Sequence, residues 1–176
     1  PVGKYITLKE KRWGTAIEAA IGFAEMNAIL VNDYKDEQTL QQLMGGINYR
    51  GPKLIVRMDL RGRSYKDTGQ LKTDRFPARN KGFLTVLDMI DATPPAVENH
   101  LYDVQVYQYV LCKDSATAKQ IAYEARPAER NVKACLDPQG TRYIPFMRQM
   151  LTNNNLHNRP LLLADNTQMI EAAVQS

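Results

Sequence analysis

The sequence has few of the residues with which most enzymes do chemistry. It contains only three serines, two histidines and two cysteines. No G-x-x-x-x-G-K-S/T phosphate loop, G-x-G-x-x-G fingerprint or G-x-S-x-G nucleophile elbow occurs. His100 and His157 stand far apart with no Cys or acidic cluster beside them, and Cys112 and Cys135 have no Cys-x-x-Cys partner. We therefore predict that the chain is not an enzyme and uses no cofactor or metal.

Long apolar runs and a secretory leader are also missing. No run approaches the roughly 18 residues of a membrane span, and the opening PVGKYITLKEKRW has no apolar leader core. We expect no membrane contact, and we interpret Cys112 and Cys135 as buried reduced thiols. The 176 residues are 44% hydrophobic and 24% charged, which fits one globular domain or two small lobes with a common core.

What the sequence does contain is a duplication. Residues 17–33 read IEAAIGFAEMNAILVND, and residues 97–114 read VENHLYDVQVYQYVLCKD. Each stretch has an apolar helical segment, a polar break, a strand-like run and an aspartate, and each is followed by an amphipathic segment (DEQTLQQLM and TAKQIAYEA). The offset is 80 residues in the helical segment and 81 at Asp33 and Asp114. A repeated α/β unit predicts a pseudo-twofold body.

Hydrophobic periodicity predicts the elements. Helices are expected at 13–21, 38–44, 96–101 and 115–125, and strands at 2–8, 28–31, 53–58, 83–87, 107–112 and 131–136. We expect Gly45-Gly46 to end the helix before it, and residues 137–140 to form a turn. The predicted fold class is α/β (α+β), with two pseudo-repeated subdomains of short sheets and flanking helices.

The last residues have a pattern of their own. Asp165 with Gln168 resembles a capping box, and an apolar stripe follows it at Met169, Ile170, Ala173 and Val174. Because an isolated helix of this length is marginal in water, we expect it to continue in a longer protein.

A basic connector separates the two copies. Residues 57–81 hold eight basic side chains and three aspartates, a net charge of +5 against +4 for the whole chain. Arginine and lysine neutralise phosphates, and aromatic rings stack on unpaired bases. The connector therefore predicts a DNA-binding surface, with single strands preferred. Its candidate residues are Arg57, Arg61, Arg63, Tyr65, Lys66, Lys72, Arg75, Phe76, Arg79 and Lys81. A weaker second cluster comprises Arg126, Arg130, Lys133, Arg142 and Arg148.

The repeated stretches also resemble a known family. VGKYITLKEKRWGTAIEAAIGFAEMNAILVND is similar to the opening of the hinge domain of SMC (structural maintenance of chromosomes) proteins. GFLTVLDMIDATPPAVENHLYD, with YQYVLCKDSATAKQI, is similar to the second hinge subdomain. The F-L-T-V-L-D-M-I-D wording and the lack of a late Gly-Gly-rich loop are more similar to the larger subunit of the DNA-repair SMC complex than to cohesin or condensin subunits. The resemblance covers about residues 1–145.

The resemblance implies a hinge inserted in a long antiparallel coiled coil, in a parent protein whose ATPase head lies elsewhere. Its parts would be hinge subdomain I at 1–58, the basic connector at 59–81, hinge subdomain II at 82–150, and an exit segment with the start of a coiled coil at 151–176. It also implies a heterodimer with the hinge of a second SMC subunit, and a location on chromosomes in the nucleus.

Many SMC hinges carry a glycine-rich turn at the dimer seam, after the last strand of the second subdomain. Here only Gly140 stands in that region, followed by TRYIPFMRQML. The candidate dimer interface is therefore formed by the apolar residues Tyr143, Ile144 and Phe146.

Two other functions remain open at this point. One is a stand-alone single-stranded nucleic-acid-binding domain that uses the same connector. The other is a small α/β enzyme that uses Asp33 or Asp114, because both follow equivalent strands and could act in acid–base chemistry. We interpret these two aspartates first as helix caps, since such turns commonly place an acceptor there.

Overall fold

The computed structural model describes the chain except residues 52, 72–81, 124–130, 146–148 and 153–176. The elements of its first half are the 3-10 helix η1 (Val2–Tyr5), β1 (Ile6–Leu8), the 3-10 helix η2 (Lys11–Trp13), α1 (Gly14–Ile21), α2 (Phe23–Met26), β2 (Ile29–Val31), α3 (Tyr34–Gly46) and β3 (Ile55–Arg57). Those of its second half are β4 (Leu84–Thr85), the 3-10 helix η5 (Val86–Met89), β5 (Ile90–Ala92), α4 (Pro95–Asp103), the 3-10 helix η6 (Val106–Gln108), β6 (Tyr109–Leu111), α5 (Ser115–Tyr123), β7 (Ala134–Leu136), β8 (Arg142–Ile144) and β9 (Gln149–Leu151).

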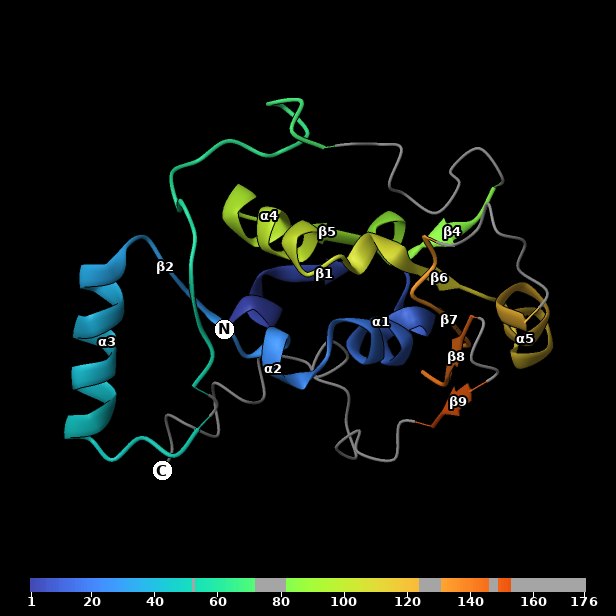
Figure 1. Ribbon diagram of the computed structural model, residues 1–176, viewed down its shortest axis with the longest axis horizontal. Helices are drawn as coiled ribbons and strands as arrows, with labels where there is room; N and C mark the ends of the chain where they lie inside the picture. The colour runs from blue at the N-terminus through green and yellow to red at the C-terminus, as the bar shows by residue number, and fades with distance from the viewer. Residues whose placement is uncertain (52, 72–81, 124–130, 146–148, 153–176) are drawn as a thin grey trace.

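The duplication predicted from the sequence is present in the fold. Strand β2 pairs in parallel with β3 across helix α3, and β6 pairs in parallel with β7 across helix α5. A parallel pair needs a crossover connection, which a helix supplies in both copies. We call β2, α3 and β3 the first lobe, and α5 with the five-stranded sheet β4-β6-β7-β8-β9 the second lobe. Figure 1 shows α3 and α5 at opposite ends of the molecule.

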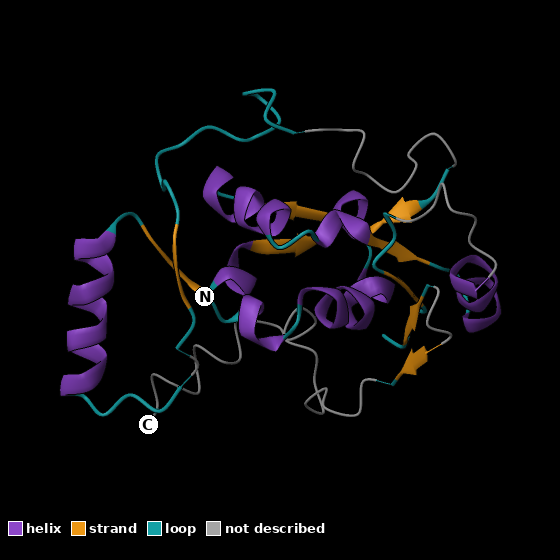
Figure 2. Ribbon diagram, viewed as in Figure 1, coloured by secondary structure: helices purple, strands orange, loops and turns teal. Residues whose placement is uncertain are grey.

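The two halves meet at a central strand pair. Strands β1 and β5 run antiparallel, with Thr7 opposite Asp91, and Figure 2 shows this pair between the helices. Each strand precedes the first helix of its copy, α1 or α4. Helix α1 ends at Gly22, whose φ of +87° suits a residue without Cβ. Helix α4 starts with Pro95, which is favoured in the first turn because its missing N–H is not needed there.

One hydrophobic core joins both halves. It contains Trp13 and Ile17 from the first half, and Val97, Leu101 and Leu136 from the second. A smaller cluster belongs to the second lobe alone and includes Val110, Cys112, Cys135 and Tyr143. His100 is 2% exposed, and its Nε2 lies 3.0 Å from Glu25 Oε2 of α2. The two halves are thus packed as one body.

Several sequence predictions are confirmed. Both cysteines are buried, and neither is in a disulfide. The turn at 137–140 closes with Gly140 N–H donating to Asp137 C=O at 2.9 Å. Asp33 caps α3 by accepting from Asp36 N–H at 3.0 Å, and Asp114 Oδ1 accepts from Thr117 N–H at 2.7 Å. These backbone hydrogen bonds lower the pKa of both carboxyls.

Other predictions were wrong in detail. Residues 2–5 form a 3-10 turn rather than part of a strand, and the strand expected at 83–87 is cut to two residues before η5. Gly45 and Gly46 are the last two residues of α3, as expected, but the left-handed conformation is taken by Asn48, with φ of +50°, and not by a glycine. The expected helix near Asp165 lies outside the described residues. None of the described helices could cross a bilayer.

Candidate functional site

The basic connector contains a segment that is docked on helix α4. We call residues 59–71 the strap; they are the part of the predicted connector that the structure describes. The other predicted DNA contacts, Lys72, Arg75, Phe76, Arg79 and Lys81, lie outside the described residues. Figure 1 shows the strap passing from β3 above α4.

Polar side chains of α4 hold the strap. Ser64 Oγ donates to Glu98 Oε2 at 2.7 Å. Asn99 Oδ1 accepts from the Tyr65 N–H at 2.8 Å, and Asn99 Nδ2 donates to the Arg63 C=O at 2.9 Å. Because Ser64 and Asn99 are both buried, these bonds are protected from water and fix the strap's backbone.

Tyr65 and Lys66 are engaged with the same helix. The Tyr65 hydroxyl donates to Asp103 Oδ2 at 3.2 Å, and partial burial, with this carboxylate, raises the pKa of Tyr65. Lys66 Nζ pairs with Glu98 Oε1 and lies 5.9 Å from the centre of the Tyr102 ring. Partial burial disfavours the charged lysine, but Glu98 and Tyr102 together outweigh it, so the pKa of Lys66 is raised. Both predicted DNA contacts therefore have partners within the protein.

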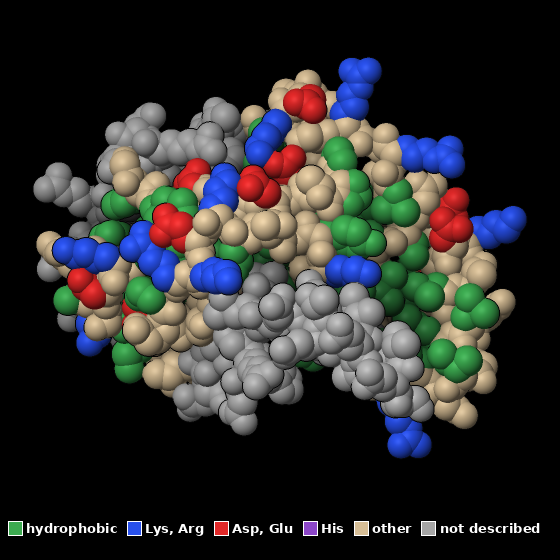
Figure 3. Space-filling view, turned by 180° about the vertical axis from the view of Figure 1, so that it is seen from behind, with side chains coloured by type: hydrophobic (Ala, Val, Ile, Leu, Met, Phe, Trp, Pro, Cys, Tyr) green, Lys and Arg blue, Asp and Glu red, His purple; other side chains and the backbone are tan. Residues whose placement is uncertain are grey.

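The other described basic residues of the predicted DNA-binding site differ in whether their side chains already have partners within the protein. Arg57 Nε lies 3.3 Å from Glu37 Oε2, and its guanidinium lies 6.0 Å from the centre of the Tyr34 ring. The side chains of Arg61 and Arg63 are exposed on the strap, and the structure gives them no acidic partner among the described residues. Figure 3 shows basic side chains spread over one face of the molecule, with acidic ones among many of them. Arg61 and Arg63 are thus the most available of the predicted contacts.

Little of the second basic cluster can be placed. Arg126, Arg130 and Arg148 lie outside the described residues. Lys133 lies 5.6 Å from the centre of the Tyr109 ring, and Arg142 is half-buried in β8.

The predicted dimer residues lie inside the second lobe or outside the described chain. Tyr143 is 2% exposed, and its hydroxyl donates to Asp137 Oδ2 at 3.0 Å. Ile144 is half-buried in β8, which pairs with β7 on one side and β9 on the other. Phe146 lies outside the described residues. The edge strands of this sheet are β4 and β9, and Met150 and Leu151 of β9 are 50% and 49% exposed.

The first lobe is much less covered than the second. Its sheet has two strands, and α3 buries none of its residues. Even the apolar side chains of Leu43 in α3 and of Ile47 directly after it are 61% and 74% exposed. The equivalent helix α5 buries Ala118 and Ala122. An open concavity lies between the start of α3 and β3, lined by Tyr34, Glu37, Ile55 and Arg57, among others.

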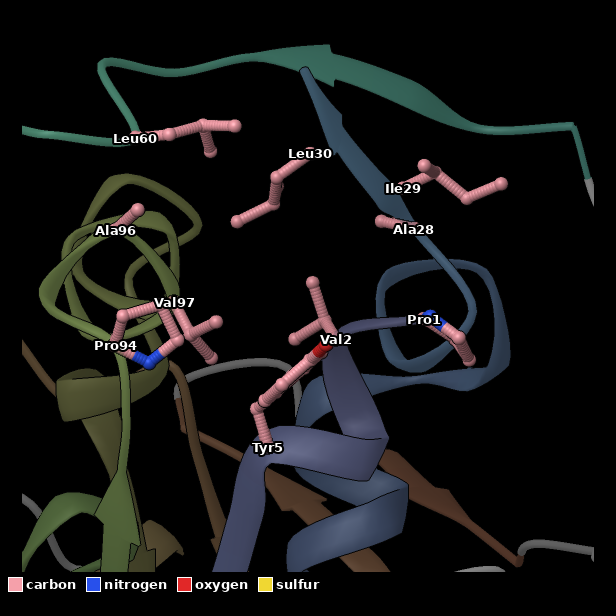
Figure 4. A pocket seen from close by; sticks show the side chains of 10 residues that line it. All are labelled: Pro1, Val2, Tyr5, Ala28, Ile29, Leu30, Leu60, Pro94, Ala96 and Val97. Carbon is pink, nitrogen blue, oxygen red and sulfur yellow. The ribbon is translucent and has the colours of Figure 1, made fainter. Parts of the chain in front are cut away.

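An apolar cavity of about 290 Å³ lies where β2, η1, the strap and the start of α4 meet. Figure 4 shows Val2, Leu30 and Val97 converging on it, with Leu60 of the strap on its rim. Asp33 and Asp114, which an enzyme would have to use, do not line this cavity, and they cap helices at opposite ends of the molecule (Figure 1). Among the described residues, no three metal-binding side chains are grouped to hold an ion.

Comparisons with known proteins agree with this fold. No protein-family model matches the chain. The chain is 30% identical to structural maintenance of chromosomes protein 6B of Arabidopsis thaliana over 128 residues, which are 72% of the chain and 11% of that protein. Among solved structures it is similar to the S. pombe Smc5/6 hinge domain, with a TM-score of 0.67, 23% identity, and coverage of 93% of this chain and 60% of that one. It is also similar to an asymmetric dimer of the Geobacillus stearothermophilus SMC hinge domain, with a TM-score of 0.57, 18% identity, and coverage of 98% and 65%.

The chain therefore has the fold of an SMC hinge. In sequence it is like SMC6 proteins, so the resemblance predicted from the sequence is confirmed. It spans 11% of the length of these curated relatives.

Sequence reasoning missed the residues that hold the strap. Glu98, Asn99 and Asp103 look like the solvent face of an ordinary amphipathic helix. The only signal in the sequence was that Glu98 and Asn99 stand beside apolar positions of a predicted helix, at the start of the second copy.

Proposed function

We propose that this chain is a dimerisation module that pairs with the hinge of a second SMC subunit through sheet edges left open in each lobe. The observation that carries the proposal is the difference between the two copies. Beyond β7, the second lobe continues into antiparallel β8 and β9. Beyond β3, no described strand continues the first lobe.

The uncovered helix supports the same conclusion. Tyr143 of β8 forms an edge-on contact with Tyr123 at the end of α5, with ring centres 6.4 Å apart. Helix α3, the equivalent element, buries none of its residues in the part of the chain that the structure describes. An open strand edge readily accepts a further strand, because its unpaired N–H and C=O groups need partners. A strand from a partner hinge would complete the first lobe as β8 completes the second.

Relatives support a partner of this kind. One similar structure is named for the hinge of Smc5/6, two subunits together, and another for a hinge dimer. We propose a heterodimer in which β3 of this chain and the edge strand β9 meet complementary edges of the partner hinge. Of the predicted interface residues, Tyr143 and Ile144 lie in β8, which pairs with β9, and Ile144 stays the candidate because its side chain is only half-buried.

A proline in β3 tests the edge directly. Leu54 accepts from Ile29 and Met58 donates to Val31, so by alternation the N–H of Ile55 faces the open side. Proline there removes a donor that only a partner strand would use. We expect Ile55→Pro to leave the fold intact by circular dichroism and to weaken partner binding at least about tenfold. Titration calorimetry with the second subunit's hinge measures this.

Ile55→Val is the matched control, because it keeps both the N–H and the β-branched side chain; it should bind as the unmodified chain does. If Ile55→Pro folds and still binds with unchanged affinity, the seam does not include the β3 edge.

Contact with DNA is a second candidate function, and the exposed pair Arg61 and Arg63 favours it. Each phosphate neutralised on a single strand contributes roughly −0.7 to the slope of log affinity against log salt. We expect Arg61→Glu with Arg63→Glu to weaken binding of a labelled oligonucleotide and to make that slope shallower by about 1.4. Arg50→Glu with Lys53→Glu is the control, because it makes the same charge change at two exposed positions outside the strap. Equal effects of the two double variants would mean that net charge, not the strap, governs binding.

The preference for single strands stays a proposal, because Tyr65 is held on α4 and Phe76 lies outside the described residues. We further propose, from the SMC6 relatives, that the parent protein acts in DNA repair and recombination on chromosomes in the nucleus. Its ATPase head would lie outside this chain, and its coiled coil would start at 151–176. The division at 1–58, 59–81, 82–150 and 151–176 is kept as part of this proposal.

A further inference from the structure

We propose that Glu98, Asn99 and Asp103 form a docking platform on α4 that holds the strap so that Arg61 and Arg63 act as a preformed phosphate clamp. The inference rests on the proposed contact with DNA. It changes the roles of Tyr65 and Lys66, which become anchors of the strap rather than DNA contacts.

Asn99 is the centre of the platform. Its side chain is 3% exposed and bonds to two backbone groups of the strap, the C=O of Arg63 and the N–H of Tyr65. An amide that satisfies a donor and an acceptor on either side of Ser64 fixes the direction of the backbone there. Removing it would leave a partly buried N–H and C=O without this partner, which is costly.

The other side of the clamp is fixed as well. The Arg61 N–H donates to Asp59 Oδ1 at 3.0 Å, and the Gly62 N–H donates to the Asp59 C=O at 3.2 Å. A Cβ on Gly62 would come within 3.0 Å of Asp59 Oδ2, so the turn is closely packed. The Leu60 N–H reaches Asn32 Oδ1 at 3.4 Å. The backbone of both arginines is therefore held while their side chains stay exposed.

The chemistry of the exposed groups selects phosphate. A guanidinium presents several N–H donors in a planar fork that matches two phosphate oxygens. A clamp that is ordered beforehand binds more tightly, because less conformational entropy is lost on binding. Lys66 is unsuited to this role: its ammonium pairs with Glu98, whose carboxylate would repel a phosphate placed beside it.

A charge swap separates an anchor from a DNA contact. The probe is a labelled oligothymidylate of about 20 nucleotides, and the variants are Lys66→Glu, Glu98→Lys and both together in the full chain. Lys66→Glu alone should weaken binding about tenfold, because it breaks the anchor and adds a like charge. The double variant restores the ion pair, and we expect its affinity within about twofold of the unmodified chain. A double variant as weak as Lys66→Glu alone would overturn the anchor role.

Replacing Asn99 tests the platform itself. Asn99→Leu has a similar volume but neither hydrogen bond. We expect the Tyr65 amide to exchange at least about tenfold faster with deuterium, and oligothymidylate affinity to fall about fivefold with an unchanged salt slope, since both arginines remain. Faster exchange with unchanged affinity would overturn the clamp.

If Asn99→Leu does not fold, the charge swap decides alone. If the unmodified chain does not bind the probe, the proposed DNA contact fails, and the clamp with it, while exchange at Tyr65 still reports whether the strap is docked.

Discussion

At the scale of single residues, one buried carboxylate organises the turn that leads into β8. Asp137 is 3% exposed and accepts from the N–H groups of Gln139 and Thr141 at 3.1 and 3.0 Å, and from the Tyr143 hydroxyl at 3.0 Å. A buried charge is tolerated only when hydrogen bonds replace its hydration. Burial first, and then this carboxylate, raises the pKa of Tyr143.

Removing the Tyr143 hydroxyl should therefore destabilise the fold. We expect Tyr143→Phe to lower the free energy of unfolding by about 1–2 kcal/mol, because Asp137 loses one of three donors while staying buried. Urea denaturation should show a lower midpoint with an unchanged slope. Tyr123→Phe, on the half-buried ring that faces Tyr143, should cost less than about 0.5 kcal/mol. Equal costs for the two variants would show that the Asp137 bond contributes nothing particular.

At the scale of elements, the two capping aspartates make the helices sensitive to acid. The pKa of Asp114 is lowered, chiefly by the Thr117 N–H. A carboxyl with a lowered folded pKa stabilises the protein above its unfolded pKa, and that contribution is lost as the pH falls through the folded value. The same reasoning applies to Asp33 at the start of α3.

We expect Asp114→Ala to lower the Tm by about 3 °C at neutral pH. The difference from the unmodified chain should shrink as the pH falls from about 4 through the lowered pKa of Asp114, because protonation then removes the charged cap. Asp114→Asn keeps a cap without a titratable group, so its Tm should match the unmodified chain at pH 7 and lack this acid-dependent loss. Thermal melts over a pH series measure all three. A constant difference between the alanine variant and the unmodified chain across the series would contradict the charged cap.

Some of these elements could be predicted from the sequence, and others could not. Long periodic segments such as α1 and α3, and apolar runs such as β2 and β6, were predictable because their pattern is local. Strands β5, β8 and β9 were not predicted, since a three-residue strand is defined by its pairing more than by its own pattern. Strand β5 pairs with β1, which is distant in sequence, as Ile90 does with Leu8, whereas β8 and β9 pair with neighbours in the chain. The charge of the connector pointed to the strap. Its anchors could not be found, because only the fold brings Asn99 against the backbone of Arg63 and Tyr65.

At the scale of the whole molecule, the shared core makes the two halves one cooperative unit. Trp13, the only tryptophan, belongs to the first half and is 2% exposed. Leu136 lies in β7 of the second lobe, is fully buried and belongs to the same core cluster. Fluorescence of Trp13 therefore reports on the first half when the second half is changed.

We expect Leu136→Ala to destabilise the chain by about 2–5 kcal/mol, because it leaves a cavity in the common core. Unfolding followed by Trp13 fluorescence should shift by the same free energy as unfolding followed by circular dichroism, as a two-state transition requires. Leu43→Ala, at a position 61% exposed on α3, should change either signal by no more than about 0.5 kcal/mol. If the Trp13 transition stayed in place while circular dichroism moved, the halves would unfold independently, and a partner hinge would then be joining two separate lobes rather than completing a single body.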